Sequence, residues 1–121
     1  MYWIVIVISF ACSSKEDLFH SEKQALELYK QGMDALESKD YQIAEKLFQD
    51  ALQNDPESKS IRFHLIYSRF AQEKYEDLTW LLQYNQEHPS DLDALKLLHK
   101  YHCAQKNEKC LKLEQVILLR E

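Results

Sequence analysis

The residues best suited to chemistry in this chain are its cysteines and the histidines near them. Cys103 and Cys110 flank a short turn between two expected helices, and Cys12 lies at the end of an apolar segment. Thiolates and imidazoles bind zinc, and His99 shares a helix face with Cys103 because the two are four residues apart. His102 lies partly off that face, and the set meets no established zinc spacing. With Cys110 as the fourth candidate ligand, a metal or redox sensor that uses Cys103 and Cys110 is the alternative. We predict no metal site and no bound cofactor.

The pair Cys103 and Cys110 can also form a disulfide. Two helices joined by a tight turn can bring Cα atoms within the roughly 4.4–6.8 Å that a disulfide needs. Two free thiols that act as small core residues are the alternative, and the spacing leaves both open.

The rest of the chain does not indicate an enzyme. Gly32 is the only glycine, so there is no glycine-rich loop to cradle phosphates. The carboxylates are scattered along amphipathic segments, and no nucleophile stands beside a base. The 15 Lys and Arg residues are outnumbered by 20 Asp and Glu residues, which opposes nucleic-acid binding because that function needs a basic surface. We predict a non-catalytic protein that does not bind nucleic acid.

The first fourteen residues differ from the remainder because they carry no charged side chain. Within them, Tyr2–Cys12 is almost wholly apolar, but a helix needs roughly 20 residues to span a bilayer. The run ends in a small residue, Ala11, directly before Cys12, and polar residues follow. This pattern resembles the processing site of bacterial lipoproteins.

That resemblance implies a signal peptide over residues 1–11 and a fatty-acylated Cys12, with palmitate as a typical acyl chain, at the start of the mature protein. Residues 12–21 would be the lipidated cysteine and a polar tether, and the protein would be lipid-anchored in the bacterial cell envelope. An uncleaved short anchor is one alternative. A buried first helix or strand, with Cys12 an inert core thiol, is the other.

The polar part of the chain repeats with a period near 34 residues. Residues 39–44 are echoed by residues 73–78, and a fainter copy follows at residues 106–111. Pro56 and Pro89 are 33 residues apart. Ala, Leu, Glu, Lys and Gln dominate, and these residues favour helices. A helix–turn–helix unit of this length is typical of tetratricopeptide repeats.

The first copy resembles that family most closely. Leu28, Gln31-Gly32 and Ala35 follow the pattern of the first helix of a repeat. The pattern of the second helix is followed by Ala44, Phe48, Ala51 and the closing Asp55-Pro56. Gly32, Ala44 and Ala51 are small where the two helices must approach closely. The resemblance implies an all-α fold, a short α-solenoid of about three repeats over residues 22–121, with a plain six-helix bundle as the alternative. We expect the six helices at residues 22–38, 41–54, 57–72, 75–87, 91–105 and 107–120.

Tetratricopeptide domains bind peptides or helices in a concave groove lined by the first helices of their repeats, so the resemblance implies a non-catalytic scaffold that binds another protein or peptide in that groove. The side chains expected on that face are Tyr29, Lys30, Met33, Phe63, His64, Tyr67, Phe70, Lys96 and Lys100. The aromatic stripe Phe63, Tyr67 and Phe70 could instead be the core face of its helix. Two other roles stay open: a homo-oligomer that assembles through the last helix, which ends in an apolar run at residues 116–119, and a cytosolic adaptor.

Overall fold

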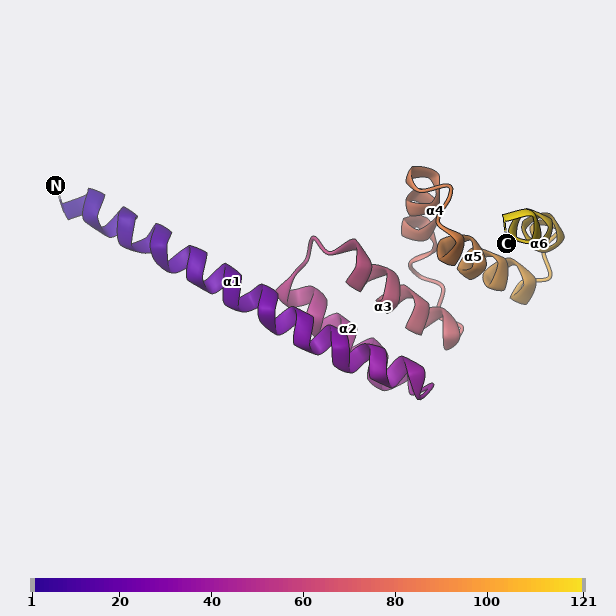
Figure 1. Ribbon diagram of the computed structural model, residues 1–121, viewed down its shortest axis with the longest axis horizontal. Helices are drawn as coiled ribbons and strands as arrows, with labels where there is room; N and C mark the ends of the chain where they lie inside the picture. Colours follow the sequence, from indigo (N-terminus) through magenta and orange to yellow (C-terminus); the bar gives the residue numbers. More distant parts are fainter. Residues whose placement is uncertain (1, 121) are drawn as a thin grey trace. The chain divides into compact units, whose positions relative to one another are not determined.

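The protein is all-α. The computed structural model describes the backbone of residues 2–120 and the side chains of residues 19–120. Figure 1 shows its six helices, which follow one another along the chain as three consecutive pairs; the helices of the first and third pairs pack on each other. Their bounds are α1 (Tyr2–Glu37), α2 (Tyr41–Asn54), α3 (Lys59–Ala71), α4 (Leu78–Glu87), α5 (Leu92–Ala104) and α6 (Lys109–Arg120). The predicted fold class is confirmed, and apart from the start of α1 each bound lies within three residues of the expected one.

The start of α1 is the main difference from the expected helices. The helix begins at Tyr2 and continues through residues 12–21, where we expected a polar tether. Neither glycine nor proline occurs before Gly32, so no residue in this segment ends a helix. The side chain of Cys12 lies outside the described residues. Among the residues that the structure describes, there is no helix with the length and apolar character needed to cross a membrane.

The chain divides into two compact units, residues 1–65 and residues 66–121, and the division falls within α3. In the first unit α1 packs along α2 (Figure 1), and the first half of α3 contributes to the same core. The buried residues of this core are Ala25, Ala44, Phe48, Ala51, Ile61 and Leu65. Ala44 and Ala51 therefore lie where the spacing predicted them, at the contact between the helices of the first pair.

Gly32 shows how close α1 and α2 are. A Cβ atom added to Gly32 would lie 2.6 Å from Cε1 and 2.8 Å from Cδ1 of the Phe48 ring. Carbon atoms in contact are normally about 3.5–4.0 Å apart, so even a methyl group does not fit. Phe48 is fully buried, so its ring can retreat only by displacing its neighbours in the core. The absence of a side chain at Gly32 is what permits this packing.

The three pairs share one type of turn. A residue in the left-handed region, with φ of 54–62°, follows the first helix of each pair: Lys39, Glu73 and Lys106. In the first pair the Lys39 N–H donates to the Leu36 carbonyl (2.9 Å), and the Asp40 N–H donates to the Ala35 carbonyl (2.9 Å). This is the Schellman arrangement, and both hydrogen bonds recur in the second and third pairs. The sequence period is therefore also a period of backbone conformation.

The second unit is built around α5. Both α4 and α6 pack against α5. Its start is capped by Asp91, whose Oδ1 accepts hydrogen bonds from the N–H groups of Asp93 (3.1 Å) and Ala94 (3.3 Å). The other carboxylate oxygen of Asp91 accepts a hydrogen bond from the Tyr84 hydroxyl (2.9 Å), so one side chain links α4 to α5. Burial and Asp91 together raise the pKa of Tyr84.

The turn before α4 is longer than expected, because α4 begins at Leu78 and not near Tyr75. The Tyr75 ring lies against the rings of Phe70 (5.1 Å between centroids) and Tyr101 (4.9 Å). Arg69 holds the end of the turn, since its Nη1 donates to Asp77 Oδ2 at 2.6 Å. These contacts keep residues 72–77 out of the helix.

Candidate interaction surface and cysteine–histidine cluster

The first unit joins two of the expected binding residues, Tyr29 on α1 and His64 on α3. Their rings meet edge to face with centroids 5.4 Å apart, and the Tyr29 hydroxyl lies 3.2 Å from His64 Nδ1. Both rings also lie 5.8 Å from Phe48, which anchors them to the core. The ring of Phe63 lies edge-on to His64 at 5.5 Å. Sequence reasoning assigned these three half-buried side chains to one face, and the structure brings them together.

The hydrogen bonds of His64 indicate which of its ring nitrogens carries a hydrogen. Its Nδ1 lies 2.8 Å from the Ser60 carbonyl oxygen, which can only accept, so Nδ1 carries the hydrogen. The Tyr29 oxygen then shares that hydrogen as a second acceptor, and a hydrogen bond of 3.2 Å joins the hydroxyls of Tyr29 and Ser60. This network holds both aromatic rings in one orientation.

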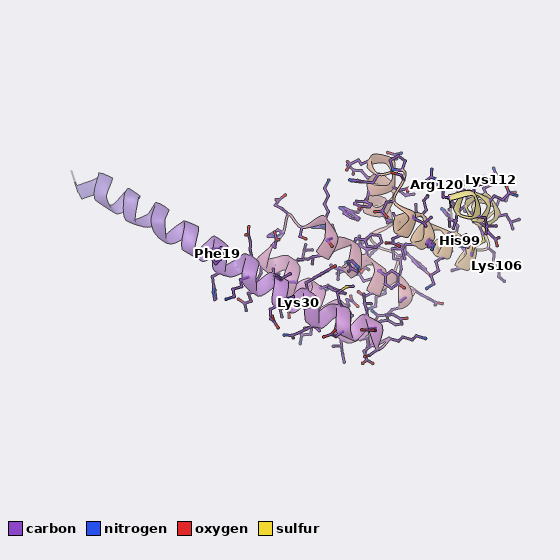
Figure 2. All side chains as sticks on the ribbon, viewed as in Figure 1. Phe19, Lys30, His99, Lys106, Lys112 and Arg120 are labelled. Atoms are coloured by element: carbon purple, nitrogen blue, oxygen red, sulfur yellow. A yellow bond between two sulfur atoms is a disulfide. The ribbon has the colours of Figure 1, made fainter. Side chains whose placement is uncertain are left out.

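An exposed apolar row runs along the outer flank of α1 beside Tyr29. Only part of this row was identified from the sequence. Lys30 and Met33 are exposed, as the proposed face requires. Phe19 and Leu26 are more exposed still, at 72% and 54% of their surface. We call Phe19, Leu26 and Met33 the α1 stripe; Figure 2 shows Phe19 and Lys30 along the same helix. The seven-residue spacing of the stripe, two helical turns at each step, is the signal that could have found it.

In the second unit, Tyr67 and Lys100 form the clearest contact among the expected binding residues. The Lys100 ammonium lies 5.7 Å from the centroid of the half-buried Tyr67 ring, within reach of a cation–π interaction. Lys96, one turn before Lys100 on α5, is also exposed. These residues offer a cationic and aromatic surface.

Phe70 does not fit the expectation that it offers surface to a partner. It is buried, and the rings of Tyr75 and Tyr101 lie against it at 5.1 Å and 6.0 Å. The last residue of the aromatic stripe expected on α3, Phe70, therefore belongs to the core, because the long turn brings Tyr75 back over the helix. At Phe70 the alternative, that the stripe is the core face of its helix, is the one that the structure has.

Cys103 and Cys110 are joined by a disulfide, with their Cα atoms 4.8 Å apart. Of the two alternatives that the spacing left open, the structure has the bonded pair. His99 lies beside it, with Nε2 3.9 Å from Cys110 Sγ. The two sulfur atoms and a ring nitrogen of His99 all lie within 4.8 Å of one another. Sequence reasoning had set this cluster aside because it matched no known spacing.

His102, which we had considered with this set, is not part of the cluster. It is buried, and its Nδ1 has no hydrogen-bond partner among the described residues. Burial lowers the pKa of His102, and the nearby Lys109 ammonium lowers it further.

The last helix is apolar on its outer side. Ile117 is buried, but Leu111, Leu118 and Leu119 are exposed at 68%, 65% and 87%. Packing against α5 therefore buries only part of the apolar run at the end of α6.

No family model, curated protein or solved structure matches this chain. The functional argument therefore depends on the residues themselves. Fixed aromatic rings beside exposed apolar and cationic side chains are suited to recognising another protein, since such residues supply contact area at low entropic cost.

Proposed function

We propose that this protein is a tetratricopeptide-like scaffold that binds another protein or peptide without catalysis. The binding surface is the flank of α1 formed by the α1 stripe together with Tyr29 and Lys30. The single observation that carries the proposal is the exposure of three large apolar side chains in register along one helix. An amphipathic helix with apolar side chains seven residues apart is the partner that fits such a row.

Two features of this flank support binding there. Large exposed apolar patches on small proteins commonly mark interaction sites. Tyr29 borders the row and is held by His64 and Ser60, so a partner meets a ring that is already ordered. Ordering before binding reduces the entropic cost of association.

We further propose that the scaffold is anchored in the bacterial envelope through a fatty-acylated Cys12. The supporting residues are the uncharged apolar run before Cys12 and the small Ala11 directly preceding it. The disulfide between Cys103 and Cys110 supports the same location, because disulfides persist in exported proteins and are rare in the cytosol.

The test is site-specific cross-linking in the full chain, expressed in bacterial cells. A photoreactive amino acid at Met33 is compared with one at Gln31, which is also exposed but lies on the opposite side of α1. We expect one discrete cross-linked protein from position 33 that disappears when Leu26→Glu is added, and none from position 31. Equal products from both positions, or a product that Leu26→Glu does not affect, would contradict the proposed surface.

A second candidate role is self-association through α6, which the exposure of Leu111, Leu118 and Leu119 favours. Sedimentation velocity of the full chain in detergent tests it, with Leu118→Glu as the variant and Glu114→Gln, at an exposed residue of the same helix, as the control. The candidate predicts an oligomer that Leu118→Glu dissociates. A monomer at all concentrations removes it.

A further inference from the structure

The cysteine–histidine cluster of the second unit offers more than a structural disulfide. His99 and Cys103 lie one turn apart on α5, and Cys110 lies at the start of α6. Figure 2 shows His99 on α5, which packs against α6. We propose that reduction of the Cys103–Cys110 disulfide converts this cluster into a binding site for one Zn²⁺ ion, held by His99, Cys103 and Cys110.

The spacing of the donor atoms suits a tetrahedral zinc ion. Zn–S bonds of about 2.3 Å and Zn–N bonds of about 2.0–2.1 Å place neighbouring donor atoms roughly 3.5–3.8 Å apart. His99 Nε2 is already 3.9 Å from Cys110 Sγ. The Cys103 sulfur lies within 4.8 Å of both other donor atoms. The two sulfur atoms must separate once their bond is reduced, and rotation about the Cα–Cβ bonds can move them.

The chemical nature of the donors also favours zinc. Two thiolates and an imidazole form a borderline-soft ligand set, which zinc prefers over the oxygen ligands suited to calcium or magnesium. Three protein ligands leave one coordination position of a tetrahedral ion for water or another ligand, and all three residues are only half-buried. Three protein ligands with an open fourth position is the arrangement of a reactive zinc site, whereas structural sites have four.

Reduction is what makes the ligands available. Two equivalents of a monothiol reductant, or one dithiol, supply the two electrons and two protons that convert the disulfide into two thiols, and the reductant becomes a disulfide. Each thiol then releases its proton when its sulfur binds the metal. A disulfide has no thiolate to donate, so the oxidised protein cannot hold the ion in this way. Disulfide and zinc are therefore alternative states of one site.

This inference does not rest on the proposed scaffold function, because it uses only residues of α5 and α6. The compartment decides which state predominates. In an oxidising compartment the disulfide is the resting form, and zinc binding would follow its reduction.

Zinc titration of the full chain tests the proposal. The protein, reduced with a phosphine and freed of metal, is titrated with Zn²⁺ against a chromophoric chelator, and bound metal is counted by native mass spectrometry. We expect one zinc per reduced chain and none on the oxidised chain. Replacement of zinc by Co²⁺ should give the intense d–d bands of a tetrahedral site and a thiolate charge-transfer band.

Variants separate the proposed site from chance binding. Cys103→Ser should abolish tight binding. His99→Gln should weaken it by at least about tenfold, since even outer-shell partners of a metal change affinity by roughly 10–100-fold. His20→Gln, on an exposed histidine of α1, is the matched control and should leave the affinity unchanged. Formation of the disulfide in oxidised His99→Gln, read as a mass loss of two hydrogens, shows that the turn still folds.

Two results would overturn the inference. One is a reduced wild-type protein that binds no more zinc than Cys103→Ser does. The other is a folded His99→Gln variant with the wild-type affinity, because then the imidazole is not a ligand.

Discussion

Replacing Gly32 with alanine tests the packing of α1 on α2 directly. At an exposed position within a helix, this change would stabilise the helix by about 0.8–1 kcal/mol, because alanine has a higher helix propensity than glycine. Here the new Cβ would lie 2.6 Å from a ring atom of Phe48. The ring must retreat by about 1 Å to restore normal contact, and overpacking of a core typically costs about 1–3 kcal/mol. After the helix preference is subtracted, we therefore expect Gly32→Ala to give none of the usual stabilisation and to lower the stability of the first unit by up to about 2 kcal/mol.

Native-state hydrogen exchange of the full chain is the assay, read by mass spectrometry on peptides from α2. It measures the opening of the first unit without assuming that the two units unfold together. Gln31→Ala, one residue away and exposed, is the matched control and should change the opening free energy by less than about 0.5 kcal/mol. Exchange in peptides from α5 should stay the same in both variants.

A double-mutant cycle with Phe48→Leu identifies the cause. Removal of the ring makes room for the new methyl group, so Gly32→Ala should cost less in the Phe48→Leu background, with a coupling of about 1 kcal/mol or more. If Gly32→Ala instead stabilises α2 by the full helix-propensity value, the two helices are not as close as the structure has them and the reasoning fails.

The other predictions concern the second unit, and exchange in peptides from α5 measures each. Asp91→Ala removes the cap of α5 and should cost about 1–2 kcal/mol, whereas Asp91→Asn keeps an acceptor oxygen and should cost much less. Arg69→Ala leaves Asp77, which is only 22% exposed, without its ion pair and should cost about 1–3 kcal/mol, an expectation that an unchanged exchange rate would refute. Cys103→Ser with Cys110→Ser should cost about 2–3 kcal/mol from the loss of a short closed loop. A reductant should destabilise the wild type similarly and leave that double variant unaffected.

The helices and the first pair could be predicted because their signals are local. Helix propensity and the 34-residue period located all six helices apart from the start of α1, and the small residues Gly32 and Ala44 identified the contact between α1 and α2. The echo at Lys39 proved to mark a backbone turn, which is stronger evidence of repetition than the similarity of side chains.

What could not be predicted depended on contacts between distant residues. The helix that carries Phe70 has apolar residues on several faces. The sequence pattern therefore does not distinguish whether Phe70 packs in the core or contacts a partner. Tyr75 decides the matter, and its position follows from the long turn that Arg69 and Asp77 stabilise. The cluster at His99 was considered but set aside for a related reason, since its donors come from two helices and match no linear motif.

The central claim, that a helical scaffold is anchored in the envelope through Cys12, is tested most directly by fatty-acid labelling. The full chain is expressed in bacteria with labelled palmitate and then separated by detergent phase partition, with Cys12→Ser as the variant and Cys103→Ser as the control for cysteine loss. We predict a labelled, detergent-phase protein whose label disappears in Cys12→Ser and persists in Cys103→Ser. An unlabelled protein that stays in the aqueous phase, or a label that survives Cys12→Ser, would contradict the account.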